Sequence, residues 1–100
     1  MRARRKKHLE ERSNLVNDIV IMSKTTELLG LPENERYDLI DYNLVFNNSN
    51  SVELEIGCGK GGFICEAAKQ NPNINFIAVE KTANVIVSAC EKAKKEGINN

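Results

Sequence analysis

A strand pattern that runs directly into a cluster of glycines constrains the fold of this chain more than any other feature. Val52, Leu54 and Ile56 alternate with two glutamates, which is the period of two expected of a β-strand. Four glycines follow within six residues, and apolar residues then recur at helical spacing from Phe63 onward. The stretch therefore predicts a strand, a glycine turn and a helix.

A glycine turn between a strand and a helix is suited to bind a nucleotide-like ligand. Glycine lets the backbone turn tightly and approach a ligand without a Cβ atom in the way. The N-terminus of the following helix offers free N–H groups and a partial positive charge. The turn is therefore the first place to look for a binding site.

The remainder of the second half repeats the same pattern. We expect a helix from Gly62 to Gln70, which Asn71-Pro72-Asn73 stops, and a second strand over residues 75–80. Thr82 is expected to cap a third helix that ends near Gly97. Strand, helix, strand and helix at these lengths predict an α/β fold, the first β-α-β-α part of a doubly wound parallel sheet.

The first fifty residues differ in composition from the strand-helix-strand-helix unit that follows them. Residues 1–50 are read as a basic N-terminal arm with an irregular and helical extension, and residues 51–100 as the ligand-binding part. The first twelve residues carry a net charge of +4 and the remaining 88 a net charge of −4. The arm could meet phosphates, although a solvated terminus is an equal alternative. The candidate phosphate contacts of the arm are Arg2, Arg4, Arg5, Lys6 and Lys7.

The segment between the arm and the first strand gives weaker signals. Leu15 to Met22 could form a short amphipathic helix, or Ile19 to Met22 could be a strand, and periodicity does not decide between them. Thr25 to Leu31 resembles one or two helical turns, ended by Gly30 and Pro32. Residues 43–51 are rich in Asn and Ser and predict a loop that leads to the first strand.

Cysteine and hydropathy patterns exclude several classes of protein. Cys58, Cys65 and Cys90 form no Cys-x-x-Cys pair and the chain has one histidine, so neither a disulfide framework nor a metal site is expected. No apolar run approaches the ~20 residues that span a membrane. We therefore expect a reduced, cytoplasmic protein without a membrane or metal partner.

Two cofactor classes share this architecture. Gly57, Gly59 and Gly62 satisfy the Gly-x-Gly-x-x-Gly fingerprint of dinucleotide sites, with Glu80 about twenty residues further on. The spacing Glu55-x-Gly57-x-Gly59-x-Gly61 instead favours S-adenosyl-L-methionine. A carboxylate at Glu55 would repel a pyrophosphate but could anchor the ammonium group of a methionine moiety.

Glu55 and Glu80 are interpreted as ligand-binding residues, whereas the nearby Glu53 is not. Glu80 could accept hydrogen bonds from both hydroxyls of a ribose under either cofactor. Glu53 lies on the same face of the strand as Glu55 but one pleat earlier, so it is interpreted as structural. Lys60 has no phosphate-loop context and is expected to face solvent.

Several blocks of this sequence resemble the bacterial tRNA (guanine-N7)-methyltransferases. They are the start Met-Arg-x-Arg-x-Lys, residues 52–64, Ala68 to Ile77 with Glu80, Val85-Ile-Val87 and Glu91-Lys-Ala93. The resemblance implies a Rossmann-like class I methyltransferase fold, S-adenosyl-L-methionine as cofactor and methyl transfer to N7 of guanine 46 in the variable loop of tRNA. It also implies that Glu55, Glu80 and the backbone of Gly57, Gly59 and Gly61 contact the cofactor, with no role carried over to residues 13–50.

The resemblance also sets an expectation about completeness. Members of that family run to more than twice this length, so the chain is expected to be the N-terminal portion, to hold no catalytic residue and to be inactive alone. Two parallel strands leave an open sheet edge, and one hypothesis is a dimer that pairs these edges. The alternatives are a fragment of a nicotinamide-dependent oxidoreductase and a non-catalytic module that binds S-adenosyl-L-methionine.

Overall fold

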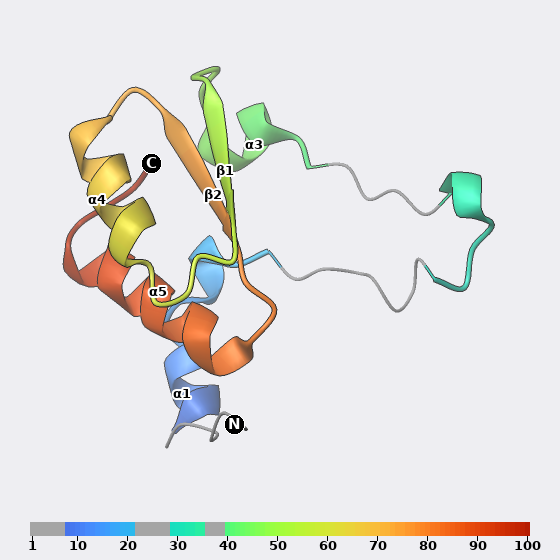
Figure 1. Ribbon diagram of the computed structural model, residues 1–100, viewed down its shortest axis with the longest axis horizontal. Coiled ribbons are helices and arrows are strands. Elements are labelled where there is room, and N and C mark those ends of the chain that lie inside the picture. Colours follow the sequence, from blue (N-terminus) through green and yellow to red (C-terminus); the bar gives the residue numbers. More distant parts are fainter. Residues whose placement is uncertain (1–7, 22–28, 36–39) are drawn as a thin grey trace.

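A computed structural model describes residues 8–21, 29–35 and 40–100. Figure 1 shows the helices and strands of these residues along the chain. In order they are α1 (Leu9–Asn14), η1 (Asn17–Ile19), η2 (Glu33–Glu35), α3 (Tyr42–Phe46), β1 (Val52–Ile56), α4 (Gly62–Gln70), β2 (Asn75–Val79) and α5 (Ala83–Lys95).

The two strands form a parallel pair. Val52 lies opposite Asn75 and Ile56 lies opposite Val79, so the strands are in register over their whole length. Their carboxyl ends therefore lie side by side, at the edge where parallel α/β sheets bind ligands. The predicted α/β fold with a parallel sheet is confirmed.

Helices α4 and α5 cover one face of the strands, and Figure 1 shows them on the same side. Phe76 and Ala78 of β2 point toward this side and pack against a buried cluster. The cluster consists of Cys58, Ile64, Cys65 and Ala89. The glycine turn and both helices thus share a single small core.

The other face of the strands is apolar and exposed among the described residues. Leu54, Ile56 and Val79 alternate with the core-facing positions, and their exposed fractions are 59%, 79% and 47%. The continuous apolar character of β2 is typical of a strand that is covered on both faces. In the described part of the chain the second face is covered at its start, where Asn75 is buried against Asn48, and is exposed at the carboxyl ends of the strands.

Both long helices begin and end close to the predicted residues. Helix α4 spans the predicted range. Thr82 is the residue before α5, but its side chain makes no capping hydrogen bond. Its backbone carbonyl accepts hydrogen bonds from Val85 and Ile86, and its N–H donates to Glu80. At the other end, Gly97 adopts a φ of 68°, a left-handed conformation that closes the helix.

The end of the chain lies along the outer edge of β2. The N–H of Phe76 donates to the carbonyl of Asn100, on the edge of β2 that faces away from β1. The side-chain amide of Asn100 also donates to the carbonyls of Ala68, Asn71 and Ile74, which closes the end of α4. Residue 100 therefore lies at the edge of β2 that does not pair with β1.

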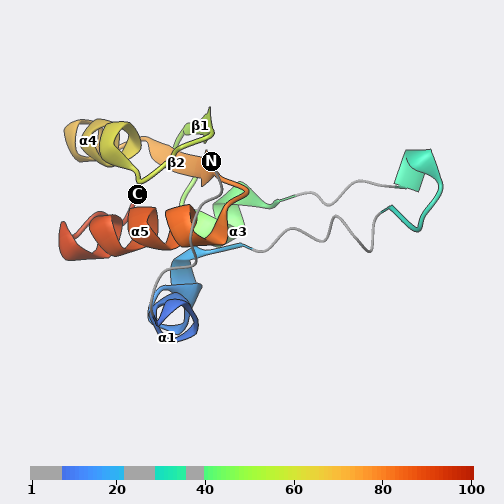
Figure 2. The ribbon, with the colours of Figure 1, turned by 60° about the horizontal axis from the view of Figure 1, so that its bottom comes forward.

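The N-terminal segment packs on the outer side of α5, and Figure 2 shows α4, α5 and α1 one beneath another. Arg12 binds Glu91 through two nitrogen atoms, one of them Nε at 2.8 Å from Oε2. Lys94 Nζ lies 2.7 Å from Oδ1 of Asp18. Val16, which lies between Arg12 and Asp18 in the sequence, is buried.

Two expectations for the first half need correction. Residues 43–51 are not loop throughout, because α3 occupies Tyr42–Phe46. Asp41 starts this helix by accepting a hydrogen bond from the Leu44 N–H, and Asn47 ends it at a positive φ. The stretch from Leu15 to Ile21 forms neither the amphipathic helix nor the strand: a turn leads into the single 3-10 turn η1, and Val20 is extended. Met22 lies outside the described residues. Most of the predicted helical turns over 25–31 lie outside the described residues.

Within the described parts of the chain, no helix is both long and apolar enough to cross a membrane.

Candidate cofactor-binding site

The glycines of the turn separate into two groups by backbone conformation. Gly57, Gly59 and Gly61 have positive φ angles of 78°, 57° and 85°. Gly62 does not, and it forms the first residue of α4. Side chains are disfavoured at the first three positions but not at the fourth. The structure therefore needs glycine at the Gly-x-Gly-x-Gly spacing and not at the third position of Gly-x-Gly-x-x-Gly.

The three left-handed glycines differ in what lies beside them. A Cβ atom on Gly57 or Gly59 would meet nothing within 4 Å, so this part of the turn faces open space. A Cβ atom on Gly61 would lie 3.1 Å from Cβ of Ala89 and 3.4 Å from Sγ of Cys65. Gly57 and Gly59 therefore leave room for a ligand, whereas Gly61 faces the core.

Hydrogen bonds hold the start of the turn at the end of β2. The N–H groups of Gly57 and Cys58 both donate to the carbonyl of Val79, over 2.7 and 3.2 Å. A further bond, from Gly61 N–H to the carbonyl of Cys58, closes the turn. These bonds place the glycine turn beside Glu80, the residue that follows Val79.

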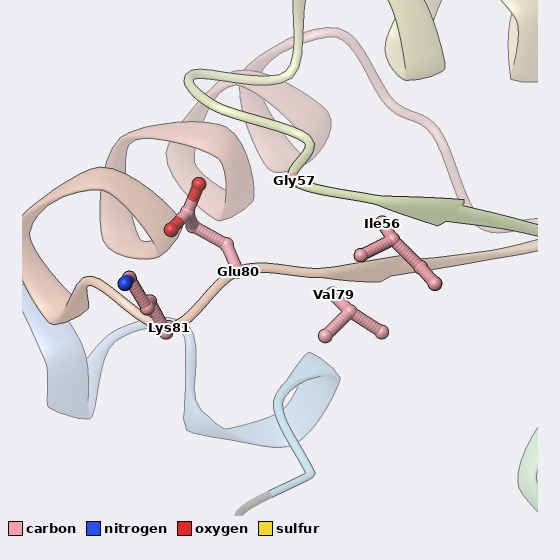
Figure 3. A pocket seen from close by; sticks show the side chains of 5 residues that line it. All are labelled: Ile56, Gly57, Val79, Glu80 and Lys81. Atoms are coloured by element: carbon pink, nitrogen blue, oxygen red, sulfur yellow. The ribbon is translucent and has the colours of Figure 1, made fainter.

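Glu80 points from the end of β2 toward the glycine turn (Figure 3). Its Oε2 atom accepts a hydrogen bond of 3.0 Å from the N–H of Thr82. This bond lowers the pKa of Glu80 most, and hydrogen bonds from the backbone of Gly59 and Lys81 lower the pKa further. The side chain is therefore a carboxylate at neutral pH, held between the turn and the first turn of α5.

Glu55 lies near the end of β1, two residues before Gly57, and is partly buried. The negative charges of Glu55 and Glu80 both affect the pKa of Cys58, which lies within the turn. The pKa of this thiol is raised, first by burial and then by the negative charges of Glu80 and Glu55. Both predicted acidic residues thus raise the pKa of the same thiol, which stays protonated and unsuited to act as a nucleophile.

An open hollow of about 290 Å³ lies at the ends of the two strands. It is lined by Ile56, Gly57, Val79, Glu80 and Lys81, and Figure 3 shows these side chains. A hollow of about 340 Å³ on the outer side of α5 is lined only by charged residues, Glu91, Lys92, Lys95 and Glu96. The first hollow contains two of the predicted ligand-binding residues, Gly57 and Glu80, and an apolar wall, so we take it as the site. Glu55, Gly59 and Gly61 are not among the residues that line it.

The other residues singled out in the sequence lie apart from the hollow or outside the described residues. Glu53 and Lys60 are exposed, and neither lines the hollow; for Lys60 this agrees with the expectation that it faces solvent. Cys58, Cys65 and Cys90 are free and buried. The basic residues Arg2, Arg4, Arg5, Lys6 and Lys7 fall outside the described ranges. Across residues 8–21, 29–35 and 40–100, no group of His, Cys, Asp or Glu is arranged to hold a metal ion.

Sequence reasoning misses the contribution of two residues to the site. The sequence predicts that Thr82 caps α5, but the structure uses its backbone N–H to hold Glu80. Ala89 is recognisable in the sequence only as part of the apolar stripe of α5, but it lies directly beneath Gly61. A small residue within an apolar stripe is the only signal in the sequence for this contact.

Comparison with known proteins gives consistent matches. The profile of a family described as "Putative methyltransferase" matches residues 49–100. A tRNA (guanine-N(7)-)-methyltransferase of Clostridioides difficile strain 630 is 39% identical over 100 residues, which is all of this chain and 42% of the relative. Proteins of the same name from Bacillus subtilis strain 168 and Ruminiclostridium cellulolyticum are 48% identical over 59 residues and 55% identical over 51 residues.

Those matches cover 59% and 51% of this chain, and 28% and 22% of the respective relatives. The chain thus spans less than half the length of these curated relatives. The part that the family profile matches is the part that contains the glycine turn, Glu55 and Glu80. On this evidence the chain belongs to that methyltransferase family.

Proposed function

We propose that this chain is the cofactor-binding part of a tRNA (guanine-N7)-methyltransferase. The single observation that carries the proposal is the geometry of Glu55-x-Gly57-x-Gly59-x-Gly61, in which all three glycines are left-handed and the first two face open space. The names of the relatives support tRNA as the substrate. Guanine 46 of the variable loop is the proposed methyl acceptor.

The hollow and the glycine turn beside it fit S-adenosyl-L-methionine. The backbone at Gly57 and Gly59 forms a surface that a Cβ atom would otherwise fill, so the methionine end of the cofactor can lie against it. Glu55 would bind the ammonium group of that end. A dinucleotide fits less well, because its pyrophosphate would approach this carboxylate and because Gly62 has no need to be glycine.

Glu80 is proposed to bind the ribose. Oε2 of Glu80 is held by the N–H of Thr82, and a carboxylate oxygen can accept more than one hydrogen bond. Its charge is retained well into the acid range because the surrounding backbone N–H groups lower its pKa. Glu80 is therefore fixed in position before the ligand arrives, which lowers the ordering cost of binding.

The chemistry itself requires alignment more than acid or base catalysis. Bound S-adenosyl-L-methionine supplies an electrophilic methyl group, and the N7 atom of guanine carries a lone pair that can attack it in line. The residues proposed here hold the cofactor, and none is assigned to the guanine. We accordingly propose that the 100-residue chain alone has no transferase activity.

The basic arm is proposed to contact tRNA phosphates. Its residues lie outside the described ranges, but the segment that follows them is held on α5 by Arg12–Glu91 and Asp18–Lys94. The root of the arm is therefore fixed to the helix that also holds Glu80. Replacing Arg2, Arg4, Arg5, Lys6 and Lys7 with alanine should weaken tRNA binding and reduce its dependence on salt concentration. A tRNA substrate would place the protein in the cytoplasm.

An organisation in two parts is proposed, with residues 1–50 as arm and extension and residues 51–100 as the cofactor-binding part. The family profile begins at residue 49, close to this boundary. The proposed dimer through the open edge of β1 has a specific obstacle. Two adjacent copies of β1 would bring Glu53 and Glu55 of each copy together, so repulsion between like charges should oppose such pairing.

Titration with S-adenosylhomocysteine tests the cofactor assignment. Amide resonances of Gly57, Gly59 and Glu80 should shift with this ligand and not with NAD. Glu80→Gln keeps an acceptor for the Thr82 N–H but presents an amide to the ribose, so it should weaken binding by about tenfold or more. Glu53→Gln is the matched control and should leave binding unchanged. A response to NAD alone, or equal affinity of wild type and Glu80→Gln, would contradict the assignment.

A further inference from the structure

Helix α5 contacts both ends of the proposed cofactor site. Its preceding residue, Thr82, donates its N–H to Glu80 at the ribose end. Seven residues later Ala89 lies against Gly61 at the methionine end. Seven residues of α-helix correspond to a rise of about 10 Å. The helix therefore links two parts of the site that are separated in the sequence.

The backbone of Gly61 passes so close to Ala89 that little room remains for a side chain between them. A Cβ atom placed on Gly61 would lie 3.1 Å from Cβ and 3.2 Å from Cα of Ala89. The backbone of the turn consequently rests on the smallest side chain that still favours a helix. Ala89 is 7% exposed and belongs to the buried cluster that includes Cys58 and Cys65, so a larger side chain there would press on its neighbours.

We propose that Ala89 is a positioning residue for cofactor binding. By limiting how closely the glycine turn approaches α5, it sets the location of the Gly57 and Gly59 backbone relative to Glu80. A larger residue at position 89 pushes the turn away from the helix while Glu80 stays fixed to Thr82. The two ends of the cofactor then no longer meet their partners at the same time. This inference rests on the proposed binding of S-adenosyl-L-methionine.

A position one helical turn further along α5 provides a matched control. Ala93 also packs against the buried cluster, but the atoms nearest to the Cβ position of Gly61 belong to Ala89 and Cys65. Ala89→Val and Ala93→Val therefore add the same two methyl groups to the same helix face. Only the first should displace the glycine turn.

Affinity for S-adenosylhomocysteine and thermal stability are measured for wild type and both variants. Ala89→Val should weaken binding by about tenfold or more, whereas Ala93→Val should stay within about threefold of wild type. A third variant, Ala93→Gly, should lower the melting temperature through poorer helix propensity but bind within about threefold of wild type. Loss of affinity that simply follows melting temperature across the three variants would overturn the inference.

A double-mutant cycle approaches the contact from the other side and does not depend on folding of Ala89→Val. Gly61→Ala adds both backbone strain and the clash with Ala89, and Ala89→Gly removes part of that clash. The loss of affinity caused by Gly61→Ala should therefore be smaller when Ala89→Gly is also present. Gly57→Ala has similar backbone strain and no neighbour, so Ala89→Gly should not rescue it. Equal losses of affinity for Gly61→Ala with and without Ala89→Gly would contradict the proposal.

Amide hydrogen exchange of the ligand-free chain separates this inference from the proposed function. In Ala89→Val, exchange at Gly59 and Gly61 should become faster while exchange in β1 and β2 stays unchanged. If wild type binds no S-adenosylhomocysteine, the proposed function fails and the exchange pattern still decides whether Ala89 positions the turn. Unchanged exchange at both glycines would overturn the inference even if the cofactor binds.

Discussion

The guanidinium group of Arg12 and the carboxylate of Glu91 form a two-point ion pair between residues 79 positions apart in the sequence. The exposed fractions of the two side chains are 27% and 38%, so the pair lies at the border between core and solvent. Glu91 is on α5, the helix that contacts both ends of the proposed cofactor site. The pair therefore connects the N-terminal segment to the site through one helix.

Replacing Arg12 with alanine should release α1 from α5. The variant loses both hydrogen bonds to Glu91, and Glu91 keeps its charge without this cation. Hydrogen exchange in α1 should become faster, while the ladder between β1 and β2 should remain protected. Glu11→Ala is the control, because Glu11 pairs with His8 at the exposed surface of α1 and its loss should leave the α5 contacts intact. Uniformly faster exchange in both regions would show that docking of α1 is not a separate local event.

Val16 tests how much the buried contact of the same segment contributes to stability. The side chain is 3% exposed, whereas the preceding Leu15 is 75% exposed. Val16→Ala should lower the free energy of unfolding by about 1–2 kcal/mol, from lost burial and incomplete filling of the space. Leu15→Ala should change it by less than about 0.5 kcal/mol. Chemical denaturation of the two variants measures the difference, and equal effects would place Val16 outside the cooperative core.

The second half of the chain could be predicted from the sequence because its signals are local. Alternation identifies β1, the Asn71-Pro72-Asn73 stop identifies the end of α4, and Gly97 identifies the end of α5. The spacing of glycines and glutamates also identifies the candidate site, since the chain must turn between parallel strands at this point. These features depend on neighbouring residues rather than on distant contacts.

The first half could not be predicted to the same extent, because it is organised by contacts across the sequence. Nothing near Arg12 or Asp18 identifies Glu91 or Lys94 as a partner. The same is true of Asn75, which is fully buried and whose Nδ2 atom donates over 2.7 Å to Oδ1 of Asn48. This bond fixes the Asn-rich segment before β1, whose sequence alone indicates only a loop.

Alanine substitutions in the glycine turn should separate required glycines from the coincidental one. Gly57→Ala should destabilise the turn by about 1–2 kcal/mol, because its φ of 78° is costly for a residue with a Cβ atom. Gly62→Ala should be neutral or stabilising by up to about 1 kcal/mol, since Gly62 begins α4 and a Cβ there meets nothing within 4 Å. Thermal melts compare the two variants. Equal destabilisation by the two substitutions would mean that Gly62 is also required, as the Gly-x-Gly-x-x-Gly fingerprint of dinucleotide sites predicts.

Stability should fall in acid because several carboxylates are bound to lysines. Lys94 lowers the pKa of Asp18, and Lys69 followed by Lys92 lowers the pKa of Glu96. A carboxyl group with a lowered pKa in the folded state binds fewer protons than in the unfolded state. Its stabilising effect is therefore present above the ordinary values of 3.8 for Asp and 4.5 for Glu, and is lost as the pH falls through the lower folded values.

The melting temperature should accordingly change little between about pH 7 and pH 5 and decrease below about pH 4.5. Glu96→Gln should make the decrease less steep, because it removes the carboxylate that both lysines bind. Glu53→Gln removes an exposed carboxylate of β1 for which no ion pair is found within the described ranges, so it is the matched control. If both variants keep the acid dependence of wild type, the lysine pairs of Glu96 do not control stability in acid, and Asp18→Asn becomes the next variant to measure.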